Sequence, residues 1–411
     1  MSVNWTVESL DSIAEMATDK VSINDLTVAN YLSTENMLPN RGGVEIAQKI
    51  PSSGNVNAFQ MGDVLFSNIR TYFKKVWLAS SNGGASADVV IFRPRDKQKI
   101  QSQYLFYLIS SDAFIESTVT TSKGTKMPRG DKDAMRNYEF SLPPLATQQR
   151  IAGILSAYDE LIENSQQRIK ILESMARTLY REWFVYFRYP GHESVPLAPS
   201  SLGDIPQGWE VEKLGEKANV LRGRSYRSVD LSEDSGLPFL NLKCLVRDGG
   251  FRRTGLKLYT GDFKENNVVK KGDIVMAVTD MTQERRIVAR AAIVPTLEGG
   301  FGIFSMDLVR VEPKPEFPKL FLYSLLRYST FADEVKQHAN GANVLHLPPD
   351  RITDYRFAVP TSDLMVDFAT FVTPLVEEID VLSNKVDNLR RTRDLLLPRL
   401  LSGQIDVEIA S

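Results

Sequence analysis

The chain carries two copies of one sequence pattern, and this internal repeat constrains its fold more than any other feature. In the clearest stretch the copies are separated by a constant 217 residues (331 − 114). The matching pairs are Phe114 and Phe331, Gly124 and Gly341, Asp133 and Asp350, Tyr138 and Tyr355, Phe140 and Phe357, and Pro143 and Pro360. A repeat unit of this length is a domain rather than one turn of a solenoid.

Upstream the same correspondence continues with small changes of offset. The segment 62–66 (Gly-Asp-Val-Leu-Phe) matches 272–276 (Gly-Asp-Ile-Val-Met) at an offset of 210 (272 − 62), and 88–90 matches 307–309 at 219 (307 − 88). Trp5 and Trp209 open the two copies. The sequence therefore predicts two domains of one design, which suggests a target with two similar halves.

Composition indicates an ordinary soluble protein of two or three domains. The 411 residues are 43% hydrophobic and 24% charged, as in typical globular proteins. The longest apolar runs, such as 320–326, are too short to cross a bilayer, and residues 1–8 lack the features of a signal peptide. The single cysteine, Cys244, excludes an internal disulfide, is expected to be a small core residue, and fits a reducing compartment, so the cytoplasm is the expected location.

Charge is unevenly distributed although the net charge is only −2. Residues 70–136 contain twelve Lys or Arg against six Asp or Glu, and residues 222–290 contain fourteen against nine. A mixed solvated surface would explain these numbers, and so would a basic face on each domain that releases counterions from phosphates.

Within each copy, strand-like and helix-like segments alternate, which predicts α+β or α/β domains. The expected strands are 63–67, 89–92 and 138–142 in the first copy and 273–278, 306–311 and 355–359 in the second. Short amphipathic helices are expected at 103–110 and 318–327, each followed by a polar loop that contains a glycine, 121–128 and 339–346.

A long helix with a heptad repeat follows each globular part. Its apolar positions are Ile151, Leu155, Tyr158, Ile162, Ile169, Leu172, Ala176, Leu179 and Trp183 in the first copy, and Val372, Leu375, Ile379, Leu382, Val386, Leu389 and Leu396 in the second. This spacing is typical of a coiled coil, in which Ser165 and Arg393 would interrupt the seam and fix its register. Because proline is tolerated in a first turn, the long heptad helix of the second copy is predicted to start at Pro374.

The two apolar stripes must be buried, since an isolated amphipathic helix is poorly stable. We expect the two helices to pair antiparallel, with packing of each helix on its own globular part as the alternative. The predicted organisation is a first domain at 1–145, a spacer helix at 146–187, a proline- and glycine-rich extended linker at 188–208, a second domain at 209–362, a second spacer helix at 363–401 and a C-terminal tail at 402–411.

No catalytic constellation is present in the sequence. His192, His338 and His346 lack metal-ligand spacing, and there is no Gly-Lys pair for a phosphate-binding P-loop. The acidic pair Asp307 and Glu312 would point to opposite faces of a strand and could not share a metal. A repeated, locally basic chain without an active site is typical of a recognition module.

Several segments give the chain its resemblance to a known family. They are 142–151 (Leu-Pro-Pro-Leu-Ala-Thr-Gln-Gln-Arg-Ile), 205–210 (Ile-Pro-Gln-Gly-Trp-Glu), 400–405 (Leu-Leu-Ser-Gly-Gln-Ile) and the two Gly-Asp turns. With two globular regions each followed by a helix, the whole chain resembles the DNA-specificity subunit of a type I restriction-modification enzyme. The second helix departs from the pattern, because 360–364 (Pro-Thr-Ser-Asp-Leu) lacks the second proline and the glutamine.

The resemblance implies a division of labour. Each target-recognition domain would bind one half of a split site in double-stranded DNA, and the two-helix coiled coil would set the spacing between the halves. Two modification (methyltransferase) subunits, with S-adenosylmethionine, would methylate adenine, and restriction (translocase and nuclease) subunits would use ATP and Mg. This chain would bind no cofactor or metal and would contribute no catalytic residue.

Base and phosphate contacts need side chains with several hydrogen-bonding groups, usually on loops of a rigid framework. The candidate DNA-binding residues are Arg70, Lys74, Lys75, Lys123, Lys126 and Arg129 in the first domain, and Arg222, Arg224, Arg227, Arg285, Arg286, Asn343 and His346 in the second.

Two other functions remain open at the level of sequence. One is a standalone DNA methyltransferase or nuclease with unrecognised catalytic residues, which would transfer methyl groups without a partner. The other is a coiled-coil adaptor without a nucleic-acid role, which would show no salt-sensitive DNA binding.

Overall fold

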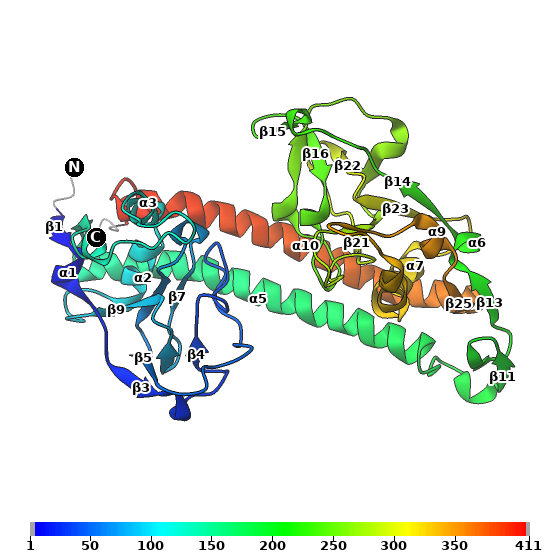
Figure 1. Cartoon of the computed structure of the whole chain (residues 1–411), viewed down its shortest axis with the longest axis horizontal. Helices are drawn as coiled ribbons and strands as arrows, with labels where there is room; N and C mark the ends of the chain where they lie inside the picture. Colours follow the sequence, from blue (N-terminus) through cyan, green and yellow to red (C-terminus); the bar gives the residue numbers. More distant parts are fainter. Residues whose placement is uncertain (1–4, 408–411) are drawn as a thin grey trace. The chain divides into compact units, whose positions relative to one another are not determined.

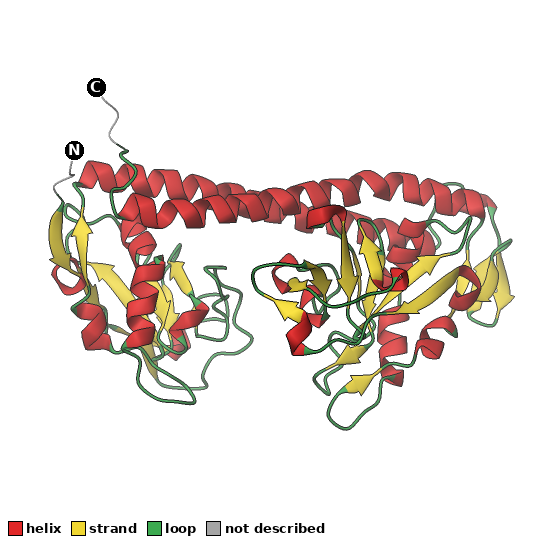
Figure 2. Ribbon diagram, turned by 90° about the horizontal axis from the view of Figure 1, so that it is seen from above, coloured by secondary structure: helices red, strands yellow, loops and turns green. Residues whose placement is uncertain are grey.

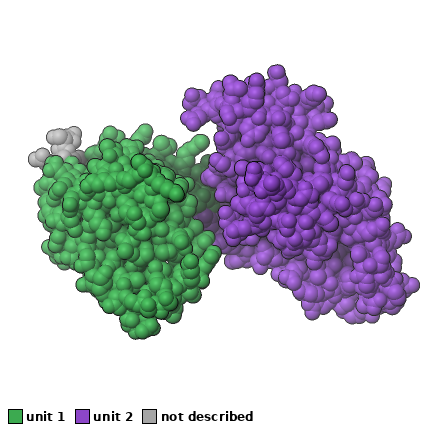
Figure 3. Space-filling view, viewed as in Figure 1, with its two compact units in different colours: residues 1–164, 385–411 green, residues 165–384 purple. Residues whose placement is uncertain are grey.

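The computed structural model describes residues 5–407 and divides the chain into two compact units (Figure 3). Unit 1 comprises residues 1–164 and 385–411, and unit 2 comprises residues 165–384. The part of the predicted C-terminal tail at 408–411 lies outside the described residues.

Unit 1 is built on two small four-stranded sheets, with strand orders β2-β9-β6-β7 and β3-β5-β8-β4, and a separate β1-β10 ladder. Its strands are β1 (Thr6–Ser9), β2 (Ala14–Met16), β3 (Lys20–Ser22), β4 (Tyr31–Leu32), β5 (Asn55–Phe59), β6 (Val64–Ser67), β7 (Val76–Leu78), β8 (Gly83–Ala85), β9 (Val89–Pro94) and β10 (Glu139–Leu142). Its short helices are α1 (Leu10–Ile13), α2 (Ser102–Ser110), α3 (Asp112–Thr120) and α4 (Lys132–Arg136).

Unit 2 contains a four-stranded sheet of order β14-β23-β19-β21 and a five-stranded sheet of order β15-β17-β16-β22-β18. Its strands are β11 (Leu197–Ser200), β12 (Gly203–Pro206), β13 (Glu210–Lys213), β14 (Ala218–Arg222), β15 (Leu231–Ser232), β16 (Leu237–Leu240), β17 (Lys257–Tyr259), β18 (Val268–Lys270), β19 (Ile274–Ala277), β20 (Thr279–Asp280), β21 (Ala291–Ile293), β22 (Phe301–Phe304), β23 (Leu308–Pro313), β24 (Leu345–His346) and β25 (Arg356–Val359). Its short helices are α6 (Leu214–Lys217), α7 (Lys319–Tyr328), α8 (Phe331–Val335) and α9 (Pro349–Thr353).

The two units share one topology, as the repeat predicts. In the first four-stranded sheet of each unit, β2, β9, β6 and β7 correspond in order to β14, β23, β19 and β21. The register is also the same, because Val64 pairs with Phe92 in unit 1 and Ile274 pairs with Val311 in unit 2. Each Gly-Asp turn is closed by its aspartate, whose side chain accepts a hydrogen bond from the amide three residues earlier, at 2.8 Å for Asp63 and 2.9 Å for Asp273.

A buried phenylalanine lies at the same place in the core of each unit. Phe114 in α3 and Phe331 in α8 are both fully buried. Phe114 packs edge-to-face on Tyr138 with ring centroids 5.1 Å apart, and Phe331 packs on Tyr355 at 5.0 Å. Each ring joins a helix to the start of the last strand, so truncation to alanine would cost about 3–5 kcal/mol.

Two forty-residue helices, α5 (Leu145–Phe184) and α10 (Ser362–Leu401), each contribute one segment to each unit. In unit 1, Asp159 of α5 bonds Arg393 of α10, and the side chain of Arg150, earlier in α5, reaches the backbone carbonyl of Val407, beyond the end of α10. In unit 2, Arg168 pairs with Glu378. Within each unit the two helices lie side by side (Figures 1 and 2), and the sequence colours of Figure 1 show that they run in opposite directions.

The aromatic end of the pair lies in the core of unit 2, where Trp183 contacts Phe368 with ring centroids 6.0 Å apart. The predicted antiparallel coiled coil is therefore present within both units. None of the following eleven predicted seam residues is exposed: Leu155, Ile162, Ile169, Leu172, Leu179, Leu375, Ile379, Leu382, Val386, Leu389 and Leu396.

The helices also pack on globular parts, and each packs on its own as well as on that of the other copy. Leu155 of α5 lies in the core of unit 1, and Phe368 of α10 lies in the core of unit 2. The C-terminal half of α5 joins the core of unit 2, where Phe184 meets Phe321 at 4.9 Å between ring centroids. Leu397 and Leu400 of α10 join the core of unit 1. Each compact unit therefore contains one globular part and a segment of both helices, which differs from the linear division predicted at 146–187 and 363–401.

The prediction that the long heptad helix starts at Pro374 is wrong, because α10 is already helical from Ser362. Proline removes one backbone hydrogen bond from a helix interior. The preceding turn is nevertheless held by tertiary packing, since Phe368 and Val372 are fully buried. The hydroxyl of Thr373 also donates to the carbonyl of Ala369 at 2.7 Å.

The segment 188–208 is also more ordered than an extended linker. Within it β11 and β12 form an antiparallel hairpin whose turn is closed by Gly203 at a φ of 94°. The ring of Tyr189 stacks on Trp209 with centroids 5.7 Å apart. This contact fixes the start of the segment on the core of unit 2.

Candidate nucleic-acid interface

A hydrogen-bonded hairpin forms the polar glycine loop of unit 1. Lys123 and Arg129 exchange two backbone hydrogen bonds of 2.9 Å, and Gly124 turns the chain at a φ of 97°. Beyond β6 the chain continues to Ile69, which pairs with Arg129. The amide of Arg70 then donates to the carbonyl of Pro128 at 2.8 Å. The end of the central strand and the loop therefore form one surface.

Unit 2 repeats this hairpin bond for bond. Asn340 and His346 exchange the same two backbone hydrogen bonds, at 3.1 and 2.8 Å. β20 continues the line of β19 and pairs with β24, so that Thr279 faces His346. These positions differ from their unit 1 counterparts by 217 (346 − 129) and 210 (279 − 69), the offsets of the sequence repeat. Both copies thus present the same framework with different side chains.

The structure brings four of the six unit 1 candidates together around the hairpin. Arg70 donates to the backbone carbonyl of Lys126 at 3.4 Å, and Arg129 is held by Asp88 at 3.1 Å. The exposed ammonium of Lys123 lies 2.5 Å from Asp131, and this hydrogen bond raises the pKa of Lys123. Lys123, Lys126 and Arg129 are exposed at the surface, and Arg70 is partly buried.

The remaining two unit 1 candidates, Lys74 and Lys75, follow the next turn of the chain. Lys74 forms an ion pair of 2.6 Å with Asp112. Lys75 donates to the carbonyl of Thr34 at 2.6 Å, and burial lowers its pKa. The ammonium of Lys75 is therefore partly buried and bonded to the protein's own backbone.

In unit 2 the hairpin is joined by a longer loop at 281–289. Gln283 donates to the carbonyls of Gly341 and Ala342, at 3.3 and 3.2 Å. Arg285 donates to the carbonyl of Ala339 at 3.3 Å. The structure thereby places the candidates Arg285, Arg286, Asn343 and His346 on two loops that are bonded to each other.

Of the other unit 2 candidates, Arg222 is the last residue of β14, and Arg224 and Arg227 follow the strand. Arg224 and Arg227 line a polar cavity of about 450 Å³ with Tyr226 and Tyr259. The backbone of Arg224 pairs with Ser305, whose hydroxyl lies 3.4 Å from Asp307.

Asp307 also connects this cavity to the hairpin. Its carboxylate accepts a hydrogen bond of 3.1 Å from Thr279, the residue that faces His346. Arg222 is exposed at the end of β14. Hydrogen bonds of Asp307 therefore link the cavity to the hairpin. The cavity carries Arg224 and Arg227, whereas the hairpin carries Asn343 and His346.

Two residues that organise this region were not predicted from the sequence. Asp280 is almost fully buried, and its carboxylate accepts hydrogen bonds from the amides of Thr282, Ile287 and Val288. Burial alone would raise the pKa of Asp280, but these amides outweigh burial and lower it. Asp280 followed by Thr282 is an Asx-turn signal that could have been found; nothing in the sequence marks Gln283.

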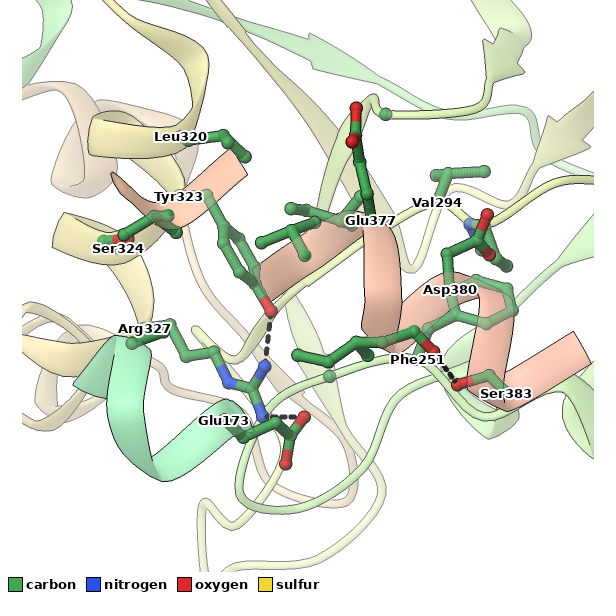
Figure 4. Close-up of a pocket in the computed structure, with 18 of the residues that line it drawn as sticks. Glu173, Phe251, Val294, Leu320, Tyr323, Ser324, Arg327, Glu377, Asp380 and Ser383 are labelled. Carbon is green, nitrogen blue, oxygen red and sulfur yellow. Dashed lines mark hydrogen bonds and ion pairs between the residues drawn. The ribbon is translucent and has the colours of Figure 1, made fainter. Parts of the chain in front are cut away.

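A second, more apolar cavity of unit 2, of about 430 Å³, lies where α7 faces α5 and α10 (Figure 4). The buried guanidinium of Arg327 donates to the hydroxyl of Tyr323 at 2.6 Å and to Glu173 at 2.9 Å. On the opposite side, Asp380 pairs with Arg253 and Lys271. These buried ion pairs fix the globular part on the helices of its own unit, which is a structural role.

The described residues offer no metal centre, since among residues 5–407 no three His, Cys, Asp or Glu side chains gather as metal ligands. Within the same range no helix is long and apolar enough to span a membrane. Cys244 is fully buried in an apolar cluster, and burial raises its pKa to about 11.

The comparisons with known proteins agree with this architecture. Residues 2–174 match the family model described as the type I restriction modification DNA specificity domain. The type I restriction enzyme MjaIX specificity subunit of Methanocaldococcus jannaschii is 25% identical over 98% of this chain and 94% of its own. The HindI specificity subunit of Haemophilus influenzae is 20% identical over 98% of this chain and 100% of its own.

Among solved structures, the crystal structure of the type I restriction-modification system S subunit from M. genitalium has the same fold. Its TM-score is 0.61 at 17% identity, and the alignment covers 97% of this chain and 96% of that chain. Over nearly its whole length the chain is therefore similar to the specificity subunits of type I restriction enzymes, and it shares the fold of a solved S subunit, with two similar domains and a coiled coil.

Proposed function

We propose that each unit reads one half of a split target in double-stranded DNA through its hairpin and the loop beside it. The observation that carries this proposal is the same hydrogen-bonded hairpin in both units with different side chains on it. The hairpin of unit 1 presents Lys123, Lys126 and Arg129, whereas that of unit 2 presents Asn343 and His346. A common framework with different polar groups is what two different half-sites require.

In this proposal phosphate and base contacts fall to different residues. Lys and Arg side chains position a protein on phosphates, and amide side chains such as Asn343 are suited to adenine edges. Arg286 and Arg227 are exposed on loops and are assigned to phosphates, although Glu284 and Asp230 hold them in the free protein. Exposed ion pairs of this kind are weak and can be exchanged for phosphate.

The paired helices are proposed to set the number of base pairs between the half-sites and to bind two modification subunits. Exposed apolar side chains on α5 and α10 support a protein-binding role, since isolated helices seldom leave such groups in water. They include Ile171, Met175, Phe371, Val381 and Leu395. The modification subunits would carry S-adenosylmethionine and methylate adenine.

Restriction subunits with ATP and Mg would join the same complex, and the chain itself would bind no cofactor. A DNA-reading component with one buried free thiol fits the cytoplasm as its location. The standalone methyltransferase or nuclease has no support in the comparisons.

The test is DNA binding and methyl transfer by the purified chain, alone and with its modification subunits. We expect sequence-specific binding whose affinity falls steeply with salt, as phosphate contacts require, and adenine methylation only when modification subunits are present. Methyl transfer by the chain alone, or binding that ignores salt, would contradict the proposed function.

A further inference from the structure

A tight turn of unit 1 is held in an unusual backbone conformation beside the hairpin. The 3-10 turn at Thr71–Phe73 lies between Arg70 and Lys74, which both adopt the left-handed region, at φ of 49° and 53°. Few residues other than glycine adopt this conformation, and such strain concentrates at functional sites.

A second left-handed pair supports this turn from the neighbouring loop. Asn40 and Arg41 have φ of 55° and 59°. Their amides donate to the carbonyls of Phe73 and Lys74, each at 2.8 Å. Four strained residues therefore meet around one turn, and the bonds between them fix its shape.

The turn presents two aromatic rings to solvent. Tyr72 is 48% exposed and Phe73 is 40% exposed, with ring centroids 4.7 Å apart. Thr71 between Arg70 and these rings is buried and anchors the turn. Adjacent exposed rings on a rigid turn are typical of a binding surface, because they contribute large contact area at low entropic cost.

The surroundings of the rings favour a nucleic acid as the occupant. Arg70 precedes them and Lys74 follows them, and the amide of Arg70 bonds the hairpin that carries Lys126. A surface with aromatic faces between cations matches a ligand with phosphates and planar bases.

From this geometry we propose that Tyr72 and Phe73 contact bases of the half-site read by unit 1, with their rings packed against base edges in a groove. The proposal rests on the proposed function and adds an aromatic contact to the basic candidates. Unit 2 differs at this place, because the longer loop at 281–289 replaces the turn and exposes Met281 instead. The two half-sites would therefore meet different apolar groups.

The test compares affinities of the full chain, in complex with modification subunits, for DNA that contains its methylation site and for DNA that lacks it. The variants are Tyr72→Ala, Phe73→Ala and their combination, with Phe73→Leu as a variant that keeps apolar volume. Met61→Ala is the matched control, since Met61 is 70% exposed in the same unit and lies outside the turn. Each affinity is measured over a range of salt concentrations.

We expect the double variant to bind its site about tenfold or more weakly, as for the loss of other base contacts in a duplex, and Met61→Ala to bind like the wild type. The slope of affinity against salt should stay unchanged, because no phosphate contact is removed, whereas Lys74→Ala should lower it by about one. Phe73→Leu should retain part of the affinity.

Unchanged affinity in the double variant would overturn the proposal, and so would a loss that appears in assembly with modification subunits without DNA. Either result leaves specific binding by the wild type intact. By contrast, absence of specific binding by the wild type would contradict the proposed function itself.

Discussion

Arg393 of α10 donates a hydrogen bond to the carboxylate of Asp159 across the helix pair in unit 1, from a position that interrupts the apolar seam. The arginine side chain is only 10% exposed, and Asp159 also accepts a hydrogen bond of 2.6 Å from the hydroxyl of Tyr107. One ionic contact thus connects both long helices to the globular part of unit 1.

Replacing Arg393 by leucine should destabilise unit 1, although the new side chain is apolar. The change leaves the partly buried Asp159 without its cation, at a cost of about 2 kcal/mol once the exposure of Asp159 is allowed for. Replacing Asp159 by leucine as well should recover most of the loss. Denaturant unfolding of the single and double variants checks this, with Arg391→Leu at an exposed position as the control.

The loop of unit 2 should lose its order in acid through Asp280. The folded-state pKa of Asp280 is lowered, so its contribution to stability is present above the unfolded value of about 3.9 and is lost as pH falls toward the folded pKa. The protection of the amides of Ile287 and Val288 from hydrogen exchange, relative to the intrinsic rate at the same pH, should therefore fall below about pH 4.

The variant Asp280→Asn tests the same carboxylate at neutral pH. An asparagine cannot accept all of these hydrogen bonds, so protection of the two amides should fall about tenfold or more and lose its dependence on acid. Asp248→Asn, at an exposed position in unit 2, is the control. Equal protection in Asp280→Asn and wild type would show that other contacts hold the loop.

The polar residues of the two hairpins should divide into those that contact phosphates and those that contact bases. Lys126→Ala should weaken binding to all DNA sequences alike and lower the salt slope by about one, whereas Asn343→Ala should relax the preference at one base pair and leave the slope unchanged. Binding to a set of single-base variants of the target measures both effects, with the exposed Lys49→Ala as the control. A change of base preference with Lys126→Ala would reverse the assignment.

A fragment ending near Gly208 should pair with a second copy of itself. It keeps α5 but lacks α10, so the stripe that contains Leu155 and Ile162 needs another helix. With modification subunits, such a pair should recognise an inverted repeat of one half-site, because identical units demand a two-fold target. A monomeric fragment, or methylation of the original split site, would contradict this prediction.

The sequence predicted the framework of the site because the repeat offsets carry over to individual hydrogen bonds. The pairs Ile69–Arg129 and Thr279–His346 follow the spacing that Gly124 and Gly341 already define. The heptad pattern likewise predicted which faces of α5 and α10 are buried. Periodicity and repeats report on backbone architecture, which both copies share.

Side-chain organisation was not predictable in the same way. The link from Arg224 to the hairpin passes through Ser305 and Asp307. Both residues are distant from Arg224 in the sequence, and hydrogen bonds connect them to it and to Thr279. Pro374 inside α10 shows packing overriding a local helix-breaking preference. No glycine stands at the left-handed positions around Tyr72 and Phe73, so the sequence carries no signal for this turn.

The claim that each unit reads one half-site is tested most directly by a map of methylated adenines. The map is made in DNA exposed to the chain in complex with modification subunits, with the wild type and with variants of one hairpin at a time. We expect a split site of two specific halves, in which Arg129 variants change the base preference only in the half read by unit 1 and Asn343 variants only in the other. A single continuous site, or a hairpin variant that alters both halves equally, would contradict it.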